Sequence, residues 1–303
     1  MTAPVDLAAA LRPQLPSPLQ EIDDEAFARR GVRLLLKRDD LIHPDLPGNK
    51  WRKLEPNLRA AAAAGDHALL TFGGAYSNHL RATAAAGRLL GFATIGVVRG
   101  DELADAPLNP SLARCAADGM RLHFIDRGRY RRKDDPEVLA ALHDRFGAFR
   151  LIPEGGSNAL AARGCVALGE ELRGVAGTVA VACGTGGTLA GLAAGLGEDG
   201  HAIGIPVLKG GRPHFLQEAV ERLQQAAFGG PRGSWRLDDR FHCGGYARRT
   251  PELDAFADAF EQRHRLPLER SYVAKLLYGL TSLAEEGAFP RGSTVAAVVT
   301  GAP

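Results

Sequence analysis

The chain has 303 residues, of which 45% are hydrophobic, and this length allows a substantial buried core in two domains or one large domain. Charged residues make up 24% and the formal net charge is +2, so the composition does not indicate binding to nucleic acid or to a membrane surface. No apolar run reaches the roughly 18 residues of a membrane span, and the N-terminus has no basic region that leads into an apolar stretch. We therefore expect a cytoplasmic protein.

The cysteine pattern argues against a scaffold of disulfides or metal. The four cysteines are widely scattered and form no C-x-x-C pair. Such spacing predicts neither a disulfide framework nor a structural zinc site. We predict free thiols in a reducing compartment and no metal site.

Short apolar runs alternate with longer helical patterns along most of the chain. The runs that predict strands are 34–36, 68–72, 93–98, 122–125, 178–182, 202–208 and 294–299. The helical patterns cover about 51–65, 78–91, 109–118, 135–146, 159–173, 187–197, 213–227, 250–264 and 273–287. This alternation predicts an α/β fold with mainly parallel sheets.

Glycine clusters follow several of the predicted strands, at 73–78, 154–158, 184–188 and 209–211. The carboxyl ends of parallel strands are where open α/β folds bind ligands. The basic run 127–133 stands apart from these clusters, and two aspartates follow it at once. We interpret this run as a solvated loop rather than an anion site.

The cluster after the predicted strand 178–183 has the composition of a phosphate cradle. It consists of Gly184, Thr185, Gly186, Gly187 and Thr188 and opens a predicted helix. Glycines let successive backbone N–H groups turn toward one anion, and the helix start adds partial positive charge. No Lys follows the last glycine, and Leu189 stands where a dinucleotide fingerprint needs its third glycine. A monoester phosphate suits this loop, and the alternative is an ordinary tight turn.

Two lysines near residue 50 are candidates for covalent chemistry. Lys50 and Lys53 lie in the sequence GNKWRK, between a predicted strand and a predicted helix. A lysine that bonds to a carbonyl group needs a desolvated position that lowers its pKa, and a helix start disfavours its charged form. The residues alone do not separate the two lysines, and both are also compatible with ordinary exposed positions.

Six motifs together resemble one known family. They are GNKWRKLEPNL, GGAYSNH, PEGGSN, CGTGGTLAGL, GGYARRTPEL and SYVAKLLYGL. In this order they resemble the landmarks of the 1-aminocyclopropane-1-carboxylate deaminase and D-cysteine desulfhydrase family, within the fold-type II enzymes that use pyridoxal 5'-phosphate. The resemblance extends from about residue 35 to residue 301. It implies a homodimer with two domains per chain, each an open, mainly parallel sheet flanked by helices. The large cofactor-binding domain would comprise 1–53 and 155–303, and the small inserted domain 54–154.

The resemblance also implies roles for individual residues. The lysine of the GNK motif holds pyridoxal phosphate in the family, which points to Lys50. Asn78 corresponds to the position that contacts the phenolic oxygen of the cofactor. Ser77 corresponds to a position beside the substrate carboxylate that assists proton transfer, and we expect His79 to contribute to substrate binding as well.

Two further positions complete the implied site. Tyr272 corresponds to the family tyrosine that lies against the cofactor and near the substrate. Thr300 has the place of the hydroxyl partner of the pyridine nitrogen. The family commonly reads His-Thr-Gly-Gly there, whereas this chain has Val-Thr-Gly-Ala at 299–302.

A departure after Tyr272 bears on the substrate. The resembled cyclopropane deaminases have Glu-Gly next, and the D-cysteine desulfhydrases have Thr-Gly, but this chain has Val273-Ala274. A neutral partner for the pyridine nitrogen favours α,β-elimination from a D-amino acid such as D-cysteine, giving a 2-oxo acid and ammonia. The alternatives are 1-aminocyclopropane-1-carboxylate deaminase, another fold-type II activity such as a dehydratase or sulfhydrylase, and a non-catalytic protein that binds pyridoxal phosphate.

Overall fold

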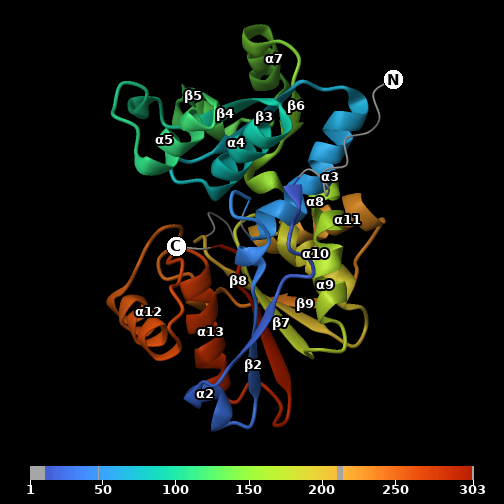
Figure 1. The fold of residues 1–303 in the computed structure, drawn as a ribbon, viewed down its shortest axis with the longest axis vertical. Coiled ribbons are helices and arrows are strands. Elements are labelled where there is room, and N and C mark those ends of the chain that lie inside the picture. Colours follow the sequence, from blue (N-terminus) through green and yellow to red (C-terminus); the bar gives the residue numbers. More distant parts are fainter. Residues whose placement is uncertain (1–10, 47, 210–213, 302–303) are drawn as a thin grey trace. The chain divides into compact units, whose positions relative to one another are not determined.

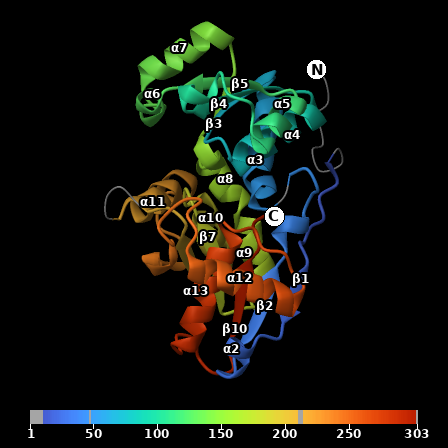
Figure 2. The ribbon, with the colours of Figure 1, turned by 90° about the vertical axis from the view of Figure 1, so that its left-hand side faces the viewer.

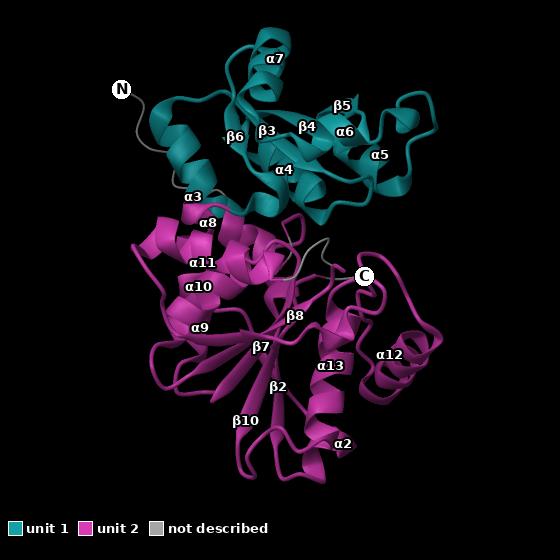
Figure 3. Cartoon of the chain, turned by 180° about the vertical axis from the view of Figure 1, so that it is seen from behind, with its two compact units in different colours: residues 1–13, 54–157 teal, residues 14–53, 158–303 magenta. Residues whose placement is uncertain are grey.

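The structure is a computed structural model that describes residues 11–46, 48–209 and 214–301 (Figure 1). The chain forms two compact units: unit 1 comprises 1–13 and 54–157, and unit 2 comprises 14–53 and 158–303 (Figure 3). The predicted domains divide the chain after residues 53 and 154, while the units divide it after residues 13, 53 and 157. The assignment of the larger domain to cofactor binding stays a prediction.

Unit 2 contains a six-stranded sheet in the order β1-β2-β10-β7-β8-β9. The strands are β1 (Leu19–Ile22), β2 (Arg33–Lys37), β7 (Thr178–Cys183), β8 (His201–Pro206), β9 (Ser234–Leu237) and β10 (Thr294–Val298). Only the β1–β2 pair is antiparallel among the pairs described. The last strand, β10, lies between β2 and β7 (Figures 1 and 2).

Helices cover both faces of this sheet. They are α2 (Glu25–Ala28), α8 (Ala159–Gly164), α9 (Val166–Leu172), α10 (Gly187–Leu196), α11 (Phe215–Phe228), α12 (Pro251–His264) and α13 (Val273–Glu285), with the 3-10 turns η1 (Asp39–Leu41) and η4 (Asp239–Phe241). Leu34 and Leu36 of β2 belong to the core beneath α12 and α13, whereas Leu35 belongs to the core beneath α9 and α10. Strands buried on both faces read as continuous apolar runs, which explains why the sequence marked them clearly.

Unit 1 contains a four-stranded parallel sheet in the order β5-β4-β3-β6. Its strands are β3 (Ala68–Gly73), β4 (Ala93–Arg99), β5 (Arg121–Ile125) and β6 (Arg150–Ile152). Its other elements are α4 (Asn78–Leu90), α5 (Pro110–Ala117), α6 (Arg127–Arg131), α7 (Pro136–Phe146), η2 (Asp101–Leu103) and η3 (Glu154–Gly156). The helix α3 (Asn49–Ala64) begins in unit 2 and continues into unit 1. The expected α/β class with mainly parallel sheets is confirmed.

The prediction of a loop at 127–133 is wrong, although the four arginines of this run are exposed to solvent as expected. Residues Arg127–Arg131 form the short helix α6, and the side chain of Asp126 accepts a hydrogen bond from the backbone N–H of Arg129. Tyr130 is buried against Phe72 and its hydroxyl donates a hydrogen bond to Glu154, so one side chain anchors a segment whose other side chains are charged. Among the residues that the structure describes, no helix combines the length and the apolar character needed to cross a membrane.

Candidate active site

The glycine-rich loop of unit 2 joins β7 to α10. Gly186 precedes the helix with a φ of 82°, in the left-handed region that favours glycine. A Cβ atom at this residue would lie 2.8 Å from Cγ2 of Val220, so the packing of α11 also requires a glycine. Glycine contributes no capping side chain, and an anion at this helix start can accept hydrogen bonds from the first-turn N–H groups.

The start of α3 lies against this loop. Nδ2 of Asn49 donates a hydrogen bond to Oγ1 of Thr188 at 2.8 Å, and both residues are buried. The amine of Lys50 donates to Oδ1 of Asn49 at 3.2 Å. This chain of two hydrogen bonds connects the Lys50 amine to the first turn of α10, directly beside the glycine loop.

The two lysines of GNKWRK differ in their surroundings. Burial lowers the pKa of Lys50 to about 8, an effect partly opposed by Cys165 and Glu269. Burial and the charge of Lys50 lower the pKa of Lys53 to about 7. Lys53 is only 2% exposed, whereas Lys50 is partly accessible. Lys50 therefore combines a lowered pKa with a position that is not fully enclosed.

Thr300 follows β10 and packs its backbone against the residue that precedes Asn49. Gly48 has a φ of 69°, and a Cβ atom there would lie 1.6 Å from the carbonyl oxygen of Thr300. Strands β10 and β7 are neighbours in the sheet, so Thr300 and Gly184 follow adjacent parallel strands. The loops after these two neighbouring strands and the start of α3 thus meet at the carboxyl ends of the strands of the unit 2 sheet.

Tyr272 stands just before α13, and its side chain reaches the loop that follows β7. A Cβ atom on Gly184 would lie 3.4 Å from the hydroxyl oxygen of Tyr272. The carboxylate of Glu269 accepts hydrogen bonds from the backbone N–H groups of Ser271, Tyr272 and Val273, at 2.8, 2.7 and 3.4 Å. This carboxylate caps the helix start and fixes the backbone of Tyr272.

Sequence reasoning missed Tyr246, which the structure brings to Tyr272. The two rings meet edge to face, with their centroids 6.0 Å apart at an angle of 70°. Tyr246 lies in the motif GGYARRTPEL, which carried the family resemblance but to which no role was given. Its preceding glycines, Gly244 and Gly245, have positive φ angles and form the turn that presents the ring.

A buried lysine holds this tyrosine loop in place. Lys275 is fully buried on α13, and its amine donates hydrogen bonds to the carbonyl oxygens of His242 and Gly245 at 2.9 and 2.6 Å. Burial lowers the pKa of Lys275. The spacing of Tyr272 and Lys275 on α13 therefore joins one aromatic ring to the loop that carries the other.

In unit 1, Ser77, Asn78 and His79 lie where β3 leads into α4. Ser77 is the N-cap of α4, and its hydroxyl accepts a hydrogen bond from the N–H of Leu80 at 3.3 Å. Ser77 and Asn78 are partly accessible. His79 is 2% exposed, and its Nε2 atom lies 2.9 Å from Oγ1 of Thr71 on β3. The structure therefore presents the first two side chains at a helix start and encloses the third within unit 1.

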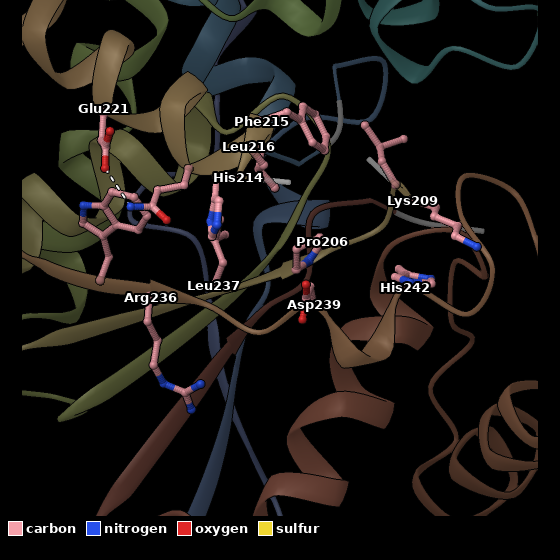
Figure 4. Close-up of a pocket in the computed structure, with 13 residues that line it drawn as sticks. Pro206, Lys209, His214, Phe215, Leu216, Glu221, Arg236, Leu237, Asp239 and His242 are labelled. Atoms are coloured by element: carbon pink, nitrogen blue, oxygen red, sulfur yellow. Dashed lines mark hydrogen bonds between the residues drawn. The ribbon is translucent and has the colours of Figure 1, made fainter. Parts of the chain in front are cut away.

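Unit 2 also has a cavity of about 850 Å³ (Figure 4). It lies at the carboxyl ends of β8 and β9, and Lys209 and His242 stand at the opposite side from Glu221 and Arg236. Leu216 lines the cavity and also packs near Gly186. The predicted site residues do not line this cavity, so its size does not make it the place of the chemistry.

The buried lysines predict an unusual dependence of stability on pH. In the folded, ligand-free protein Lys50 and Lys53 lose their protons near pH 8 and pH 7, whereas the unfolded chain keeps them to about 10.5. The unfolded state therefore binds more protons in this range, and the free energy of unfolding rises with pH. Urea denaturation of the ligand-free protein should show this rise between about pH 7 and pH 9, and Lys53→Met should reduce it.

Buried cysteines end this increase in the free energy of unfolding at high pH. Burial raises the pKa of Cys115 and Cys165 to about 11 and that of Cys183 to about 12, from 9.0 in the unfolded chain. Above about pH 9 the unfolded state loses protons that the folded state keeps, so stability falls again. A stability that stays flat or declines from pH 7 to pH 9 would contradict the lowered lysine pKa values.

Comparison with known proteins agrees with this architecture. The pyridoxal-phosphate dependent enzyme family matches residues 11–301. D-cysteine desulfhydrase of Yersinia pestis (strain Pestoides F) is 31% identical over 280 residues, which cover 86% of this chain and 83% of that protein. The mitochondrial bifunctional D-cysteine desulfhydrase/1-aminocyclopropane-1-carboxylate deaminase of Arabidopsis thaliana is 28% identical over 92% of this chain and 76% of its own length.

A solved structure gives the same result in three dimensions. The crystal structure of a 1-aminocyclopropane-1-carboxylate deaminase homologue superposes with a TM-score of 0.80 at 27% identity, over 97% of this chain and 94% of that chain. The predicted family and cofactor are thereby confirmed. The chain is a pyridoxal-phosphate-dependent enzyme and belongs to the 1-aminocyclopropane-1-carboxylate deaminase and D-cysteine desulfhydrase family.

Proposed function

We propose that Lys50 holds pyridoxal phosphate and that the enzyme eliminates a β substituent from a small D-amino acid such as D-cysteine. With D-cysteine, sulfur leaves the β carbon as hydrogen sulfide, one water molecule is consumed, and pyruvate and ammonia form. One observation carries the proposal: the hydrogen bonds from Lys50 through Asn49 to Thr188 connect an amine of lowered pKa to the glycine loop.

The residues of unit 2 fit the cofactor. The glycine loop and the first turn of α10 would hold the phosphate, through the residues Gly184, Thr185, Gly186, Gly187 and Thr188. Thr300, which follows the neighbouring strand, would place its hydroxyl at the pyridine nitrogen. Tyr272, together with Tyr246, would lie beside the ring. When bound, the cofactor supplies an aldehyde that bonds to amines and a pyridine ring that withdraws electrons from the α carbon.

The chain's own side chains supply the remaining chemistry. Lys50, with a pKa of about 8, exchanges its proton near neutral pH and acts as the base toward the proton of the α carbon. Asn78 would donate to the phenolic oxygen of the cofactor. Ser77, at the start of α4, would bind the substrate carboxylate, because a helix start favours an anion. His79 supports them by its contact with Thr71 on β3.

The residue after Tyr272 favours elimination over cyclopropane opening. Val273 is 1% exposed and offers neither a charge nor a polar side chain. A neutral hydroxyl at Thr300 leaves the pyridine nitrogen unprotonated more readily than a carboxylate would. The resulting weaker electron withdrawal suits departure of a good leaving group from the β carbon. The relative from Yersinia carries the name of such an activity.

A substrate screen on purified holoenzyme tests this proposal. D-cysteine and D-chloroalanine should release a 2-oxo acid and ammonia faster than 1-aminocyclopropane-1-carboxylate does, and L-cysteine serves as the stereochemical control. Turnover of the cyclopropane at an equal or higher rate would assign the deaminase activity instead. A yellow protein whose absorbance shifts with amino acids, without any product, would indicate a non-catalytic binding protein.

A further inference from the structure

We propose that Asp39 and Arg52 clamp the chain on both sides of Lys50, and that Arg52 is a positioning residue for the Lys50 amine. The carbonyl oxygen of Asp39 accepts a hydrogen bond from the N–H of Gly48 at 2.9 Å. Its carboxylate accepts hydrogen bonds from Nε and Nη2 of Arg52 at 2.8 and 2.9 Å. Asp39, a residue of η1, therefore contacts the chain on both sides of Lys50, at Gly48 and at Arg52. The inference rests on the proposed role of Lys50.

A second carboxylate completes the coordination of Arg52. Nη1 and Nη2 of Arg52 donate to the two carboxylate oxygens of Glu171 on α9, each at 2.9 Å. The side chains of Arg52 and Asp39 are 2% and 0% exposed, and that of Glu171 is 16% exposed. Burial alone would lower the pKa of Arg52, but these hydrogen bonds raise it above its usual value. Arg52 is thus held as a permanent cation by two planar pairs.

Lys37 and Ser17 balance the cluster. The amine of Lys37 lies 2.6 Å from Oε2 of Glu171 and 2.6 Å from the carbonyl oxygen of Ser17. The hydroxyl of Ser17 donates to Asp39 at 2.6 Å. Two cations face two anions, so no net charge is buried. Burial raises the pKa of Glu171, but the hydrogen bonds from Arg52 and Lys37 outweigh it and the pKa is lowered.

This arrangement does more than stabilise the core. The first turn of a helix frays easily because its N–H groups have no partners within the helix. Lys50 is the second residue of α3, and the clamp spans this turn. A buried ion pair adds little net stability over apolar residues, but paired hydrogen bonds between a guanidinium and a carboxylate add geometric specificity. The clamp therefore keeps the Lys50 amine in its desolvated position beside the glycine loop.

The test compares the Lys50 amine in matched variants of the ligand-free protein. Arg52→Lys keeps the positive charge but cannot form two planar pairs. Arg59→Lys is the control, because Arg59 lies on the same helix in an exposed pair with Glu55. Labelling of Lys50 by an amine-reactive reagent is followed across pH by peptide mass spectrometry. The charged groups near this amine, namely Lys53, Cys165 and Glu269, stay unchanged in both variants.

We expect Arg52→Lys to move the midpoint of the labelling profile upward from about 8 toward the ordinary value of 10.5. Each unit of this shift lowers the fraction of neutral amine about tenfold at pH 7. Arg59→Lys should leave the midpoint unchanged. If Arg52→Lys does not fold, Ser17→Ala removes one hydrogen bond to Asp39 without changing charge and should produce a smaller shift of the same sign.

An unchanged midpoint in a folded Arg52→Lys protein would overturn the clamp and leave Arg52 with a purely structural role. This readout needs no cofactor, so it is independent of the proposed function. If the proposed function is wrong instead, the midpoint still shifts, but the visible absorbance of the holoenzyme survives the loss of Lys50.

Discussion

Lys50→Ala should give a folded protein that lacks the visible absorbance of the holoenzyme and has lost its activity. The amine of Lys50 lies beside the glycine loop on a partly buried residue, and its pKa of about 8 provides both a nucleophile and a base near neutral pH. Loss of a positioned general base alone lowers rates by about 10²–10⁴-fold, and loss of the covalent attachment adds to this. Absorbance spectra and initial rates measure both effects.

Lys53→Ala is the matched control for this experiment. Lys53 lies one helical turn further along α3 and is enclosed, with 2% of its surface exposed. Its replacement should retain the visible absorbance, although the loss of a buried side chain lowers stability. Reduction of the wild-type holoenzyme with borohydride, followed by peptide mass spectrometry, should find the cofactor on Lys50. Finding it on Lys53, or an intact band in Lys50→Ala, would refute the assignment.

Gly48→Ala should disrupt the site as strongly as Lys50→Ala does, although it removes no reactive side chain. Its Cβ atom would lie 1.6 Å from the carbonyl oxygen of Thr300, and the φ of 69° adds strain of about 1–2 kcal/mol for any other residue. The start of α3 or the segment after β10 must move. Both carry residues proposed to hold the cofactor, so we expect a large loss of cofactor affinity together with lower stability.

Gly65→Ala is the control that separates the effect of backbone strain from the effect of a steric clash. Gly65 ends the same helix with a φ of 73°, but an added Cβ atom there would meet nothing within 4 Å. This variant should lose only the stability that the strained backbone costs and should keep its cofactor affinity. The measurements are cofactor titration and denaturation of both variants. Equal cofactor affinity in the two proteins would show that the contact between Gly48 and Thr300 does not shape the site.

The sequence predicts the central strands well and the short ones poorly. Strands β2, β7 and β10 are buried on both faces, so their apolar runs are conspicuous. The missed strands β1, β6 and β9 are four, three and four residues long, and each contains only two apolar residues, too few to form a recognisable pattern. Backbone pairing with a neighbouring strand stabilises them, and a pattern of side chains does not record such pairing.

Close packing explains one further difference. The segment 159–173 reads as one helix, but the structure divides it into α8 and α9 at Cys165. A Cβ atom on Gly191 of α10 would lie 2.1 Å from the carbonyl oxygen of Ala162, and one on Gly195 would lie 2.0 Å from that of Val166. The break accompanies an approach of backbones that only the folded chain reveals.

In the candidate site, too, residues within one contiguous motif could be predicted, whereas contacts between separate elements could not. Lys50, Asn78 and the glycine loop were predictable as candidates because each lies in a contiguous motif after a strand. The clamp around Lys50 was not predictable, because Asp39, Arg52 and Glu171 come from three separate elements. Likewise, the pairing of Tyr246 with Tyr272 depends on Lys275, whose amine holds a loop about thirty residues earlier in the chain.

The position of β10 has a consequence for synthesis of the protein on the ribosome. This strand supplies the link between β2 and β7, yet among the strands that the structure describes it is the last in the sequence and so is synthesised after the others. A nascent chain shorter than 298 residues leaves the edges of β2 and β7 unpaired, and exposed strand edges promote association between chains. The strands of unit 1 all lie between residues 68 and 152, so that sheet can form first. Chaperones that bind nascent chains should therefore be needed for unit 2 more than for unit 1.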